Sequence, residues 1–130
     1  MTNQLDYFFQ PDGVAVIGAS RNPAKLSYGV VKNLTSHGYQ GPIYPVNPKG
    51  GEMLGLKIYP SIAEVPDPVE LAVIMVPAPL VPDVMEACGE RGLPTVIVIT
   101  GGFKEAGPEG AELEHSLKEI AAKHGMRMIG

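Results

Sequence analysis

Five short apolar runs recur along the chain at nearly even spacing, and this spacing constrains the fold most. Consecutive runs start 29, 28, 25 and 30 residues apart, which is the length of a strand plus a crossover helix. Because the runs are continuously apolar rather than alternating, they favour strands covered on both faces, as in a parallel sheet. The runs are Val14–Ile17, Ile43–Val46, Leu71–Val76, Val96–Ile99 and Met126–Ile129.

Helical periodicity fills most of the gaps between these runs. Apolar residues repeat at helical spacing from Leu26, from Val81 and from Leu113. The second gap is weaker, but Ser61 and Glu64 have the spacing of a capping box and predict a short helix. Each long stripe stops at a basic residue followed by glycine, which is the usual C-terminal signal of a helix. These pairs are His37-Gly38, Arg91-Gly92 and His124-Gly125.

This alternation of strands and helices predicts the fold class. We expect an α/β, Rossmann-like, doubly wound and mainly parallel five-stranded sheet with helices on both faces. The length of 130 residues suits one domain. Ligands of such sheets bind at the carboxyl ends of the strands, where the strand order reverses. The loops that follow the strands are therefore the candidate functional sites.

Composition argues against several classes of partner. A net charge of −4 without a basic run disfavours nucleic acid. No apolar stretch is long enough to span a membrane, and the N-terminus lacks the pattern of a secretion signal, so we expect a cytoplasmic domain with no membrane partner. The lone cysteine, Cys88, excludes an internal disulfide and a cysteine-rich metal site.

The loop after the first run suits a phosphate group. It reads Gly-Ala-Ser-Arg-Asn-Pro-Ala-Lys from Gly18 to Lys25 and opens the first predicted helix. Backbone N–H groups and the helix dipole favour phosphate at such a place. Ser20 and Asn22 can add hydrogen bonds, and Arg21 or Lys25 can add charge. The alternative is that Ser20 or Asn22 only caps the helix.

The glycine fingerprint of nicotinamide dinucleotide sites is not met. Counting from Gly18, the other two glycine positions hold Ser20 and Pro23. The second run ends in Asn-Pro-Lys and not in the acid that would bind the ribose of NAD. Lys49 instead predicts an extra phosphate on the ribose, which NADP and coenzyme A (CoA) both carry. A solvated loop lysine is the alternative.

The loops after the third and fourth runs suit an uncharged part of the ligand. Val76–Pro79 forms a stiff Val-Pro-Ala-Pro stretch with few free donors, as in the wall of a groove. The fourth run continues into Thr100, Gly101, Gly102 and Phe103. Paired glycines allow close approach to a ligand, and the aromatic ring could cover an apolar group; the alternative is a plain turn.

Together these loops resemble the CoA-binding domain of the NDP-forming acyl-CoA synthetases. This family includes the ADP-forming acetate–CoA ligases, which the first two motifs resemble most, and the α subunit of succinyl-CoA synthetase. The resemblance implies CoA as ligand and the reaction acid + CoA + ATP ⇌ acyl-CoA + ADP + phosphate. It also implies further synthetase domains or subunits, of phosphohistidine and ATP-grasp-like types. The matching stretches are 16–23, 44–49, 76–79, 99–103 and 128–130.

The resemblance also assigns roles to the loops. Residues 20–23 would meet the CoA diphosphate, and Lys49 would lie at the adenosine end. Residues 76–79 would line the groove, and residues 99–101 would lie along the adenine or pantetheine side. No catalytic residue and no metal ligand is expected in this domain. The predicted CoA-binding residues are Gly18, Ala19, Ser20, Arg21, Asn22, Pro23, Lys25, Asn47, Pro48, Lys49, Val76, Pro77, Pro79, Ile99, Thr100 and Gly101.

We expect residues 1–130 to form one CoA-binding domain that is an N-terminal fragment of a longer synthetase. Family chains continue beyond the terminal Met-Ile-Gly, and the phosphohistidine should lie there. Alone, the chain should bind CoA without completing a turnover. Two alternatives stay open: a CoA-sensing module, free-standing or fused to an acetyltransferase, and an NADP-binding Rossmann domain.

The remaining polar candidates have structural explanations. His37 and His124 precede glycines at predicted helix ends, where capping is the preferred role. His115 lies in a charged helical stretch and should be solvated. Cys88 falls on the apolar stripe of its helix and should be a buried small hydrophobe. Asp83 and Glu86 are interpreted as charges on a helix face rather than a catalytic pair.

Overall fold

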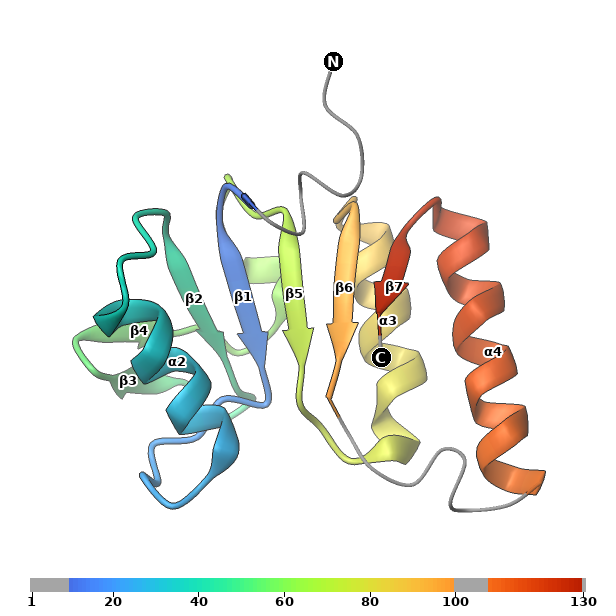
Figure 1. Cartoon of the computed structure of the whole chain (residues 1–130), viewed down its shortest axis with the longest axis horizontal. Coiled ribbons are helices and arrows are strands. Elements are labelled where there is room, and N and C mark those ends of the chain that lie inside the picture. Colours follow the sequence, from blue (N-terminus) through green and yellow to red (C-terminus); the bar gives the residue numbers. More distant parts are fainter. Residues whose placement is uncertain (1–9, 100–107, 130) are drawn as a thin grey trace.

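The apolar runs form one parallel sheet, shown in Figure 1. The computed structural model describes residues 10–99 and 108–129. The sheet has five strands in the order β2-β1-β5-β6-β7, and each neighbouring pair is parallel, as predicted. The strands are β1 (Val14–Ile17), β2 (Ile43–Val46), β5 (Leu71–Ile74), β6 (Thr95–Val98) and β7 (Arg127–Ile129).

The strand order reverses at β1. This strand lies between β2, which follows it in sequence, and β5, from which the chain continues outward to β6 and β7. All arrowheads point to the same edge in Figure 1, so the loops after β1, β2 and β5 meet there. β5 ends at Ile74, two residues earlier than the apolar run, and Met75 and Val76 consequently belong to the loop at this edge.

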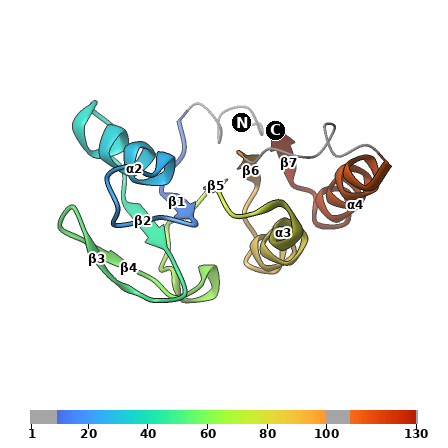
Figure 2. The ribbon, with the colours of Figure 1, turned by 90° about the horizontal axis from the view of Figure 1, so that it is seen from below.

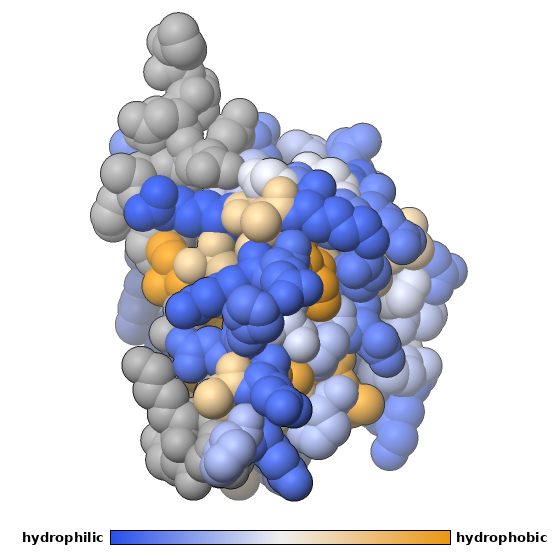
Figure 3. Space-filling model, turned by 90° about the vertical axis from the view of Figure 1, so that its right-hand side faces the viewer, coloured by the Kyte–Doolittle hydropathy of each residue, from blue (hydrophilic) through white to orange (hydrophobic). Residues whose placement is uncertain are grey.

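Helices cover both faces of the sheet, which confirms the doubly wound prediction. α2 (Leu26–Ser36) lies on one face, while α3 (Val81–Glu90) and α4 (Pro108–His124) lie on the other (Figure 2). All three end just before Gly38, Gly92 or Gly125, as the sequence predicted. The outward side of α4 is mainly hydrophilic (Figure 3).

The connection between β2 and β5 contains a hairpin that was not predicted. Its strands β3 (Gly51–Met53) and β4 (Leu56–Ile58) are antiparallel. Tyr59 follows the hairpin and pairs with the outer edge of β2: its N–H donates to Pro45 O at 2.8 Å. The connection then forms η1 (Ile62–Glu64), a single 3₁₀ turn. The predicted short helix is thus present, but Ser61 makes no side-chain cap bond.

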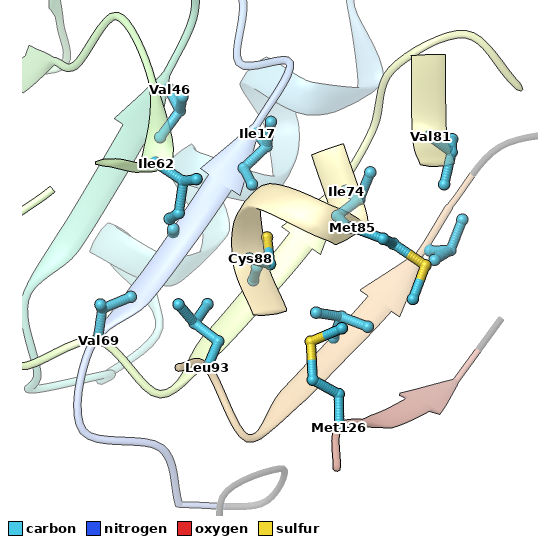
Figure 4. Packing of buried hydrophobic residues seen from close by; sticks show 14 of the residues in the cluster. Ile17, Val46, Ile62, Val69, Ile74, Val81, Met85, Cys88, Leu93 and Met126 are labelled. Carbon is cyan, nitrogen blue, oxygen red and sulfur yellow. The ribbon is translucent and has the colours of Figure 1, made fainter. Parts of the chain in front are cut away.

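Buried side chains fill both interfaces between the sheet and its helices. Ala15, Ile74 and Val96 are fully buried in one cluster with Met85 and Cys88 of α3. Figure 4 shows Ile74, Met85 and Cys88 within this cluster. A second apolar cluster packs the opposite sheet face against α2 and the hairpin. Cys88 is a buried small hydrophobe, as predicted, and burial raises the pKa of its thiol to about 12.

Candidate ligand-binding site

Gly18 brings the ends of three strands together. Its φ is +94°, and a Cβ at this position would lie 2.4 Å from the carbonyl oxygen of Met75. The loop after β1 therefore approaches the loop after β5 as closely as only glycine allows. On the other side, the N–H groups of Gly18 and Ala19 donate to Val46 O at 2.9 and 3.1 Å.

The side chains of Ser20 and Asn22 shape the loop after β1. Ser20 Oγ accepts from the N–H of Asn22, and Asn22 Oδ1 accepts from the N–H of Ala24, both at 3.0 Å. α2 begins only at Leu26, with Lys25 as its N-cap residue. The polar loop thus leads into this helix, as predicted, but neither Ser20 nor Asn22 caps it. Their bonds are local turns that hold the loop.

Asn47 ties the loop after β2 to the loop after β1. Its Nδ2 donates to Ala19 O, and its Oδ1 accepts from the N–H of Lys49, both at 2.9 Å. Its carbonyl oxygen accepts from the N–H of Gly50 at 2.9 Å. A partly buried asparagine that uses donor and acceptor in this way fixes the spacing of the two loops.

A polar pocket of about 210 Å³ opens between these two loops. Arg21 and Lys49 stand at its sides, and both are exposed. Within the described residues neither side chain has a hydrogen-bond or ion-pair partner, and the N–H groups of Ser20 and Arg21 have no acceptor. The pocket thus combines free cations with free backbone donors. Its lining is Ala19, Ser20, Arg21, Asn22, Asn47, Lys49, Gly50 and Ile58.

A larger and mainly apolar cavity of about 520 Å³ adjoins this pocket at Asn47. Its lining comes from the loops after β1, β2 and β5, from the chain around η1 and from the start of α3. Such a volume is typical of small-ligand sites. The lining is Ile17, Gly18, Val46, Asn47, Pro48, Pro60, Ser61, Ile62, Met75, Val76, Pro77, Leu80, Asp83, Val84 and Ala87.

The structure brings most of the predicted site residues together, but not all. Gly18, Ala19, Ser20, Arg21, Asn22, Asn47, Pro48, Lys49, Val76 and Pro77 line one or both spaces. Pro23, Lys25, Pro79 and Ile99 line neither of them. Thr100, Gly101, Gly102 and Phe103 lie outside the described residues.

Sequence reasoning missed the contribution of two helical segments to the cavity. Pro60, Ser61 and Ile62 enter it from the start of η1, and Leu80 and Asp83 enter it from the start of α3. The sequence did place a short helix after Ser61 and a helix from Val81. It gave no signal for which of their side chains would face a ligand.

His124 joins two helices, which goes beyond the predicted capping role. Its Nε2 lies 2.6 Å from Glu86 Oε1, and Lys123 Nζ donates to the same oxygen at 2.9 Å. Hydrogen bonds from these two side chains hold the pKa of the Glu86 carboxyl below its usual value. His37 is the C-cap residue of α2, and His115 is exposed beside Glu119.

Within residues 10–99 and 108–129, no group of His, Cys, Asp and Glu side chains could hold a metal ion. No helix in them combines the length and the apolarity needed to cross a membrane.

A family model described as "CoA binding domain" matches residues 12–130. The chain belongs to the CoA-binding domain family. The α subunit of ADP-forming acetate–CoA ligase I from Pyrococcus furiosus is 50% identical over 130 residues, covering 97% of this chain and 28% of that protein. ADP-forming acetate–CoA ligase II from Archaeoglobus fulgidus is 48% identical over 122 residues, covering 94% and 18%.

Solved structures agree with this CoA-binding domain fold. The apo structure of the dinucleotide forming acetyl-coenzyme A synthetase 1 of Ca. Korarchaeum cryptofilum has a TM-score of 0.92 and 44% identity. The match covers 97% of this chain and 27% of that one. The family resemblance read from the loop motifs is therefore confirmed. The chain spans 28% or less of the length of these three relatives.

Proposed function

We propose that this CoA-binding domain binds CoA across the polar pocket and the apolar cavity, as one domain of an ADP-forming acyl-CoA synthetase. The whole enzyme would interconvert acid, CoA and ATP with acyl-CoA, ADP and phosphate. This domain would hold CoA, while a phosphohistidine and an ATP-grasp-like nucleotide site would be supplied by further domains or subunits. The relatives support the assignment, because those from P. furiosus and A. fulgidus are ADP-forming acetate–CoA ligases.

The observation that carries the proposal is the pair of unpartnered cations at the polar pocket. Arg21 comes from the loop after β1 and Lys49 from the loop after β2, and Ser20 and Arg21, whose N–H groups have no acceptor within the described residues, line the same pocket. CoA carries a diphosphate and a 3′-phosphate on its ribose. Hydrogen bonds between charged donors and phosphate are among the stronger ones in proteins. The pocket is thus suited to the anionic half of CoA.

Within this proposal Lys49 binds the ribose phosphate and residues 20–22 lie along the diphosphate. Lys49 follows β2, where a dinucleotide-binding sheet contacts the ribose. The loop of residues 20–22 follows β1, where such a sheet contacts the diphosphate. The bonds of Asn47 to Ala19 and Lys49 fix the two loops relative to each other and so set the distance between the two phosphate subsites.

Calorimetry on the 130-residue chain tests the proposal. We expect CoA to bind about tenfold tighter than dephospho-CoA, since one charge-assisted hydrogen bond to phosphate contributes about 1.5 kcal/mol. The Lys49→Ala variant should bind the two ligands equally. Lys32→Ala, which removes an exposed lysine of α2 outside both spaces, is the matched control and should behave as the unaltered chain. Tighter binding of NADPH than of CoA would contradict the proposal.

A further inference from the structure

The segment of residues 59–65 runs from the edge of β2 to α3. At its start, the N–H of Tyr59 donates to Pro45 O at 2.8 Å, and Tyr59 O accepts from the N–H of Asn47 at 2.9 Å. These two backbone hydrogen bonds fix the segment to β2. Residues 60–62 then enter the lining of the apolar cavity. How the other end of the segment is held therefore affects the shape of the cavity.

Arg91, the C-cap residue of α3, holds this other end. Its Nη2 donates to Val65 O at 2.8 Å and to Asp67 Oδ1 at 2.9 Å. The side chain of Arg91 is 23% exposed but that of Asp67 is 83% exposed, and an ion pair with so exposed a carboxylate contributes little. The bond to Val65 O is partly buried, and no other donor to this oxygen is found within residues 10–99 and 108–129. The carbonyl of Val65 is therefore the main anchor.

Three hydrogen bonds connect α3 to η1 through Arg91. The N–H of Arg91 donates to Ala87 O at 3.0 Å, and the N–H of Val65 donates to Ile62 O at 3.2 Å. Ala87 and Ile62 both line the cavity. The bond from the Arg91 guanidinium to Val65 O completes the connection between them. Each end of this side-chain bond thus lies one backbone hydrogen bond away from a residue of the cavity lining.

Glu86 offers a comparison on the same helix. Its carboxylate joins α3 to α4 through Lys123 and His124. Neither Glu86 nor these two partners line the cavity or the polar pocket. Side chains of α3 therefore tie this helix to two different neighbours. Of the two ties, the one made by Arg91 is directly connected to the cavity lining.

We propose that Arg91 is a positioning residue, which holds η1 against α3 and so keeps the cavity in the shape that binds its ligand. Arg91 itself lines neither space. Without its bond to Val65, the segment after Ile62 would be free to move away from α3. The fraction of molecules with a binding-competent cavity would then fall, and the apparent affinity would fall with it. The inference rests on the proposed function for the identity of the ligand, CoA, but not for the motion of η1.

Arg91 also has a purely structural explanation. A cation at the C-terminus of a helix interacts favourably with the helix dipole. Loss of that interaction would lower the stability of the whole domain, but it would not make η1 move within the folded state. A measurement on the folded, ligand-free chain therefore separates the two roles.

Methyl relaxation dispersion on the ligand-free chain is this measurement. Arg91→Met keeps an unbranched apolar side chain and removes the donors, so the Ile62 methyl signal should show exchange on the microsecond to millisecond timescale. Val31, buried in the cluster on the opposite face of the sheet, is the internal reference and should show none. Glu86→Gln is the matched control and should leave the Ile62 signal unchanged. Absence of exchange at Ile62 in Arg91→Met, or equal exchange at Val31, would overturn the proposal.

Titrations with two ligands test the effect on binding. One hydrogen bond from a charged donor corresponds to a factor of about ten in an equilibrium, so Arg91→Met should weaken CoA binding about three- to tenfold in calorimetry. Inorganic pyrophosphate needs only the polar pocket, and its affinity, followed through the amide NMR signals of Ser20 and Arg21, should not change. Arg91→Lys keeps a donor for Val65 O and should recover most of the CoA affinity. Asp67→Ala should weaken CoA less than about twofold, because it removes only the exposed partner.

The outcomes distinguish the role of Arg91 from the proposed function. Unchanged CoA affinity in Arg91→Met, or an equal loss for CoA and pyrophosphate, would overturn the positioning role. A loss of CoA affinity in Glu86→Gln as large as that in Arg91→Met would overturn it as well, since breaking any tie of α3 would then suffice. If the unaltered chain does not bind CoA, the proposed function fails, while the exchange at Ile62 still decides whether Arg91 holds η1.

Discussion

Replacing Gly18 by alanine should separate the loops that form the site and destabilise the fold. Two effects add at this position. The backbone is held at φ +94°, where a residue with a Cβ is strained, and the Cβ would lie 2.4 Å from the Met75 carbonyl oxygen. The backbone carbonyl of Met75 follows β5 directly and cannot turn away as a flexible side chain could.

The size of the effect can be estimated from these two terms. A positive φ in a non-glycine residue costs about 1–2 kcal/mol. Forcing an extra carbon against packed backbone costs about 1–3 kcal/mol more. The sum is about 2–5 kcal/mol, a large share of the roughly 5–15 kcal/mol that stabilises a typical domain. For 130 residues, 1 kcal/mol corresponds to about 4 °C in Tm, so Gly18→Ala should lower Tm by about 8–20 °C.

Gly38→Ala is a matched control for the backbone term. Gly38 follows α2 with φ +87°, nearly the value of Gly18, but a Cβ there would have nothing within 4 Å. This variant should therefore lose only about 1–2 kcal/mol, or about 4–8 °C in Tm. Thermal and urea unfolding followed by circular dichroism measure both variants. The difference between the stability losses of the two variants gives the energetic cost of the close contact between the loops after β1 and β5.

The reasoning would be refuted if the two variants lost the same stability. That result would mean that the loops after β1 and β5 do not meet at Gly18. The inference that these loops form one site would then fail. A calorimetric titration of Gly18→Ala with CoA adds a functional reading. We expect weakened binding even well below Tm, because the loop that presents Ser20 and Arg21 starts at this residue. Gly38→Ala, outside both spaces, should bind CoA normally.

Three further predictions concern charge and burial. Added salt should weaken CoA binding, since Arg21 and Lys49 are exposed and salt screens their attraction to the CoA phosphates. The Lys49→Ala variant should show a smaller dependence of affinity on salt. An affinity for CoA that does not change with salt would contradict this prediction. The Cys88 thiol, with its pKa raised to about 12, should resist a thiol reagent at pH 8 in the folded chain and react after unfolding; rapid labelling of the folded chain would disprove its burial. The pKa of Glu86 is lowered in the folded state, so its stabilising contribution is present above its usual value of 4.5 and is lost as pH falls through the folded pKa. The stability advantage over Glu86→Gln should accordingly shrink below pH 4.5 in urea unfolding, and an advantage that grows with acid would refute this.

The central strands could be predicted because they are buried on both faces. Every residue of β1 and β5 is buried, so hydrophobicity alone marks them in the sequence. The hairpin could not be recognised in this way. Its strands have three residues each, and Glu52 and Lys57 are exposed while Met53 and Ile58 are buried. Its position depends on pairing with the edge of β2 through Tyr59, which is a tertiary contact.

The same distinction applies to the candidate site. The loops after β1 and β2 could be located from the strand ends, because parallel strands bring their carboxyl ends to one edge. The part that α3 adds depends on how this helix is rotated against the sheet. Val81, Met85 and Cys88 form its fully buried stripe. Leu80 and Val84 are offset from that stripe and face the cavity, which helical periodicity alone does not distinguish from solvent.

The missing glycines of the dinucleotide fingerprint follow from where α2 starts. In the fingerprint, a tight turn leads directly into a helix whose N-terminus contacts the diphosphate. Here the helix starts at Leu26, and the intervening loop is held by the side chains of Ser20 and Asn22. Gly18 does need to be glycine, since a Cβ there would meet the backbone of Met75. Because a helix dipole acts mainly within its first turn, the proposed CoA complex relies more on Arg21, Lys49 and the loop N–H groups than on α2.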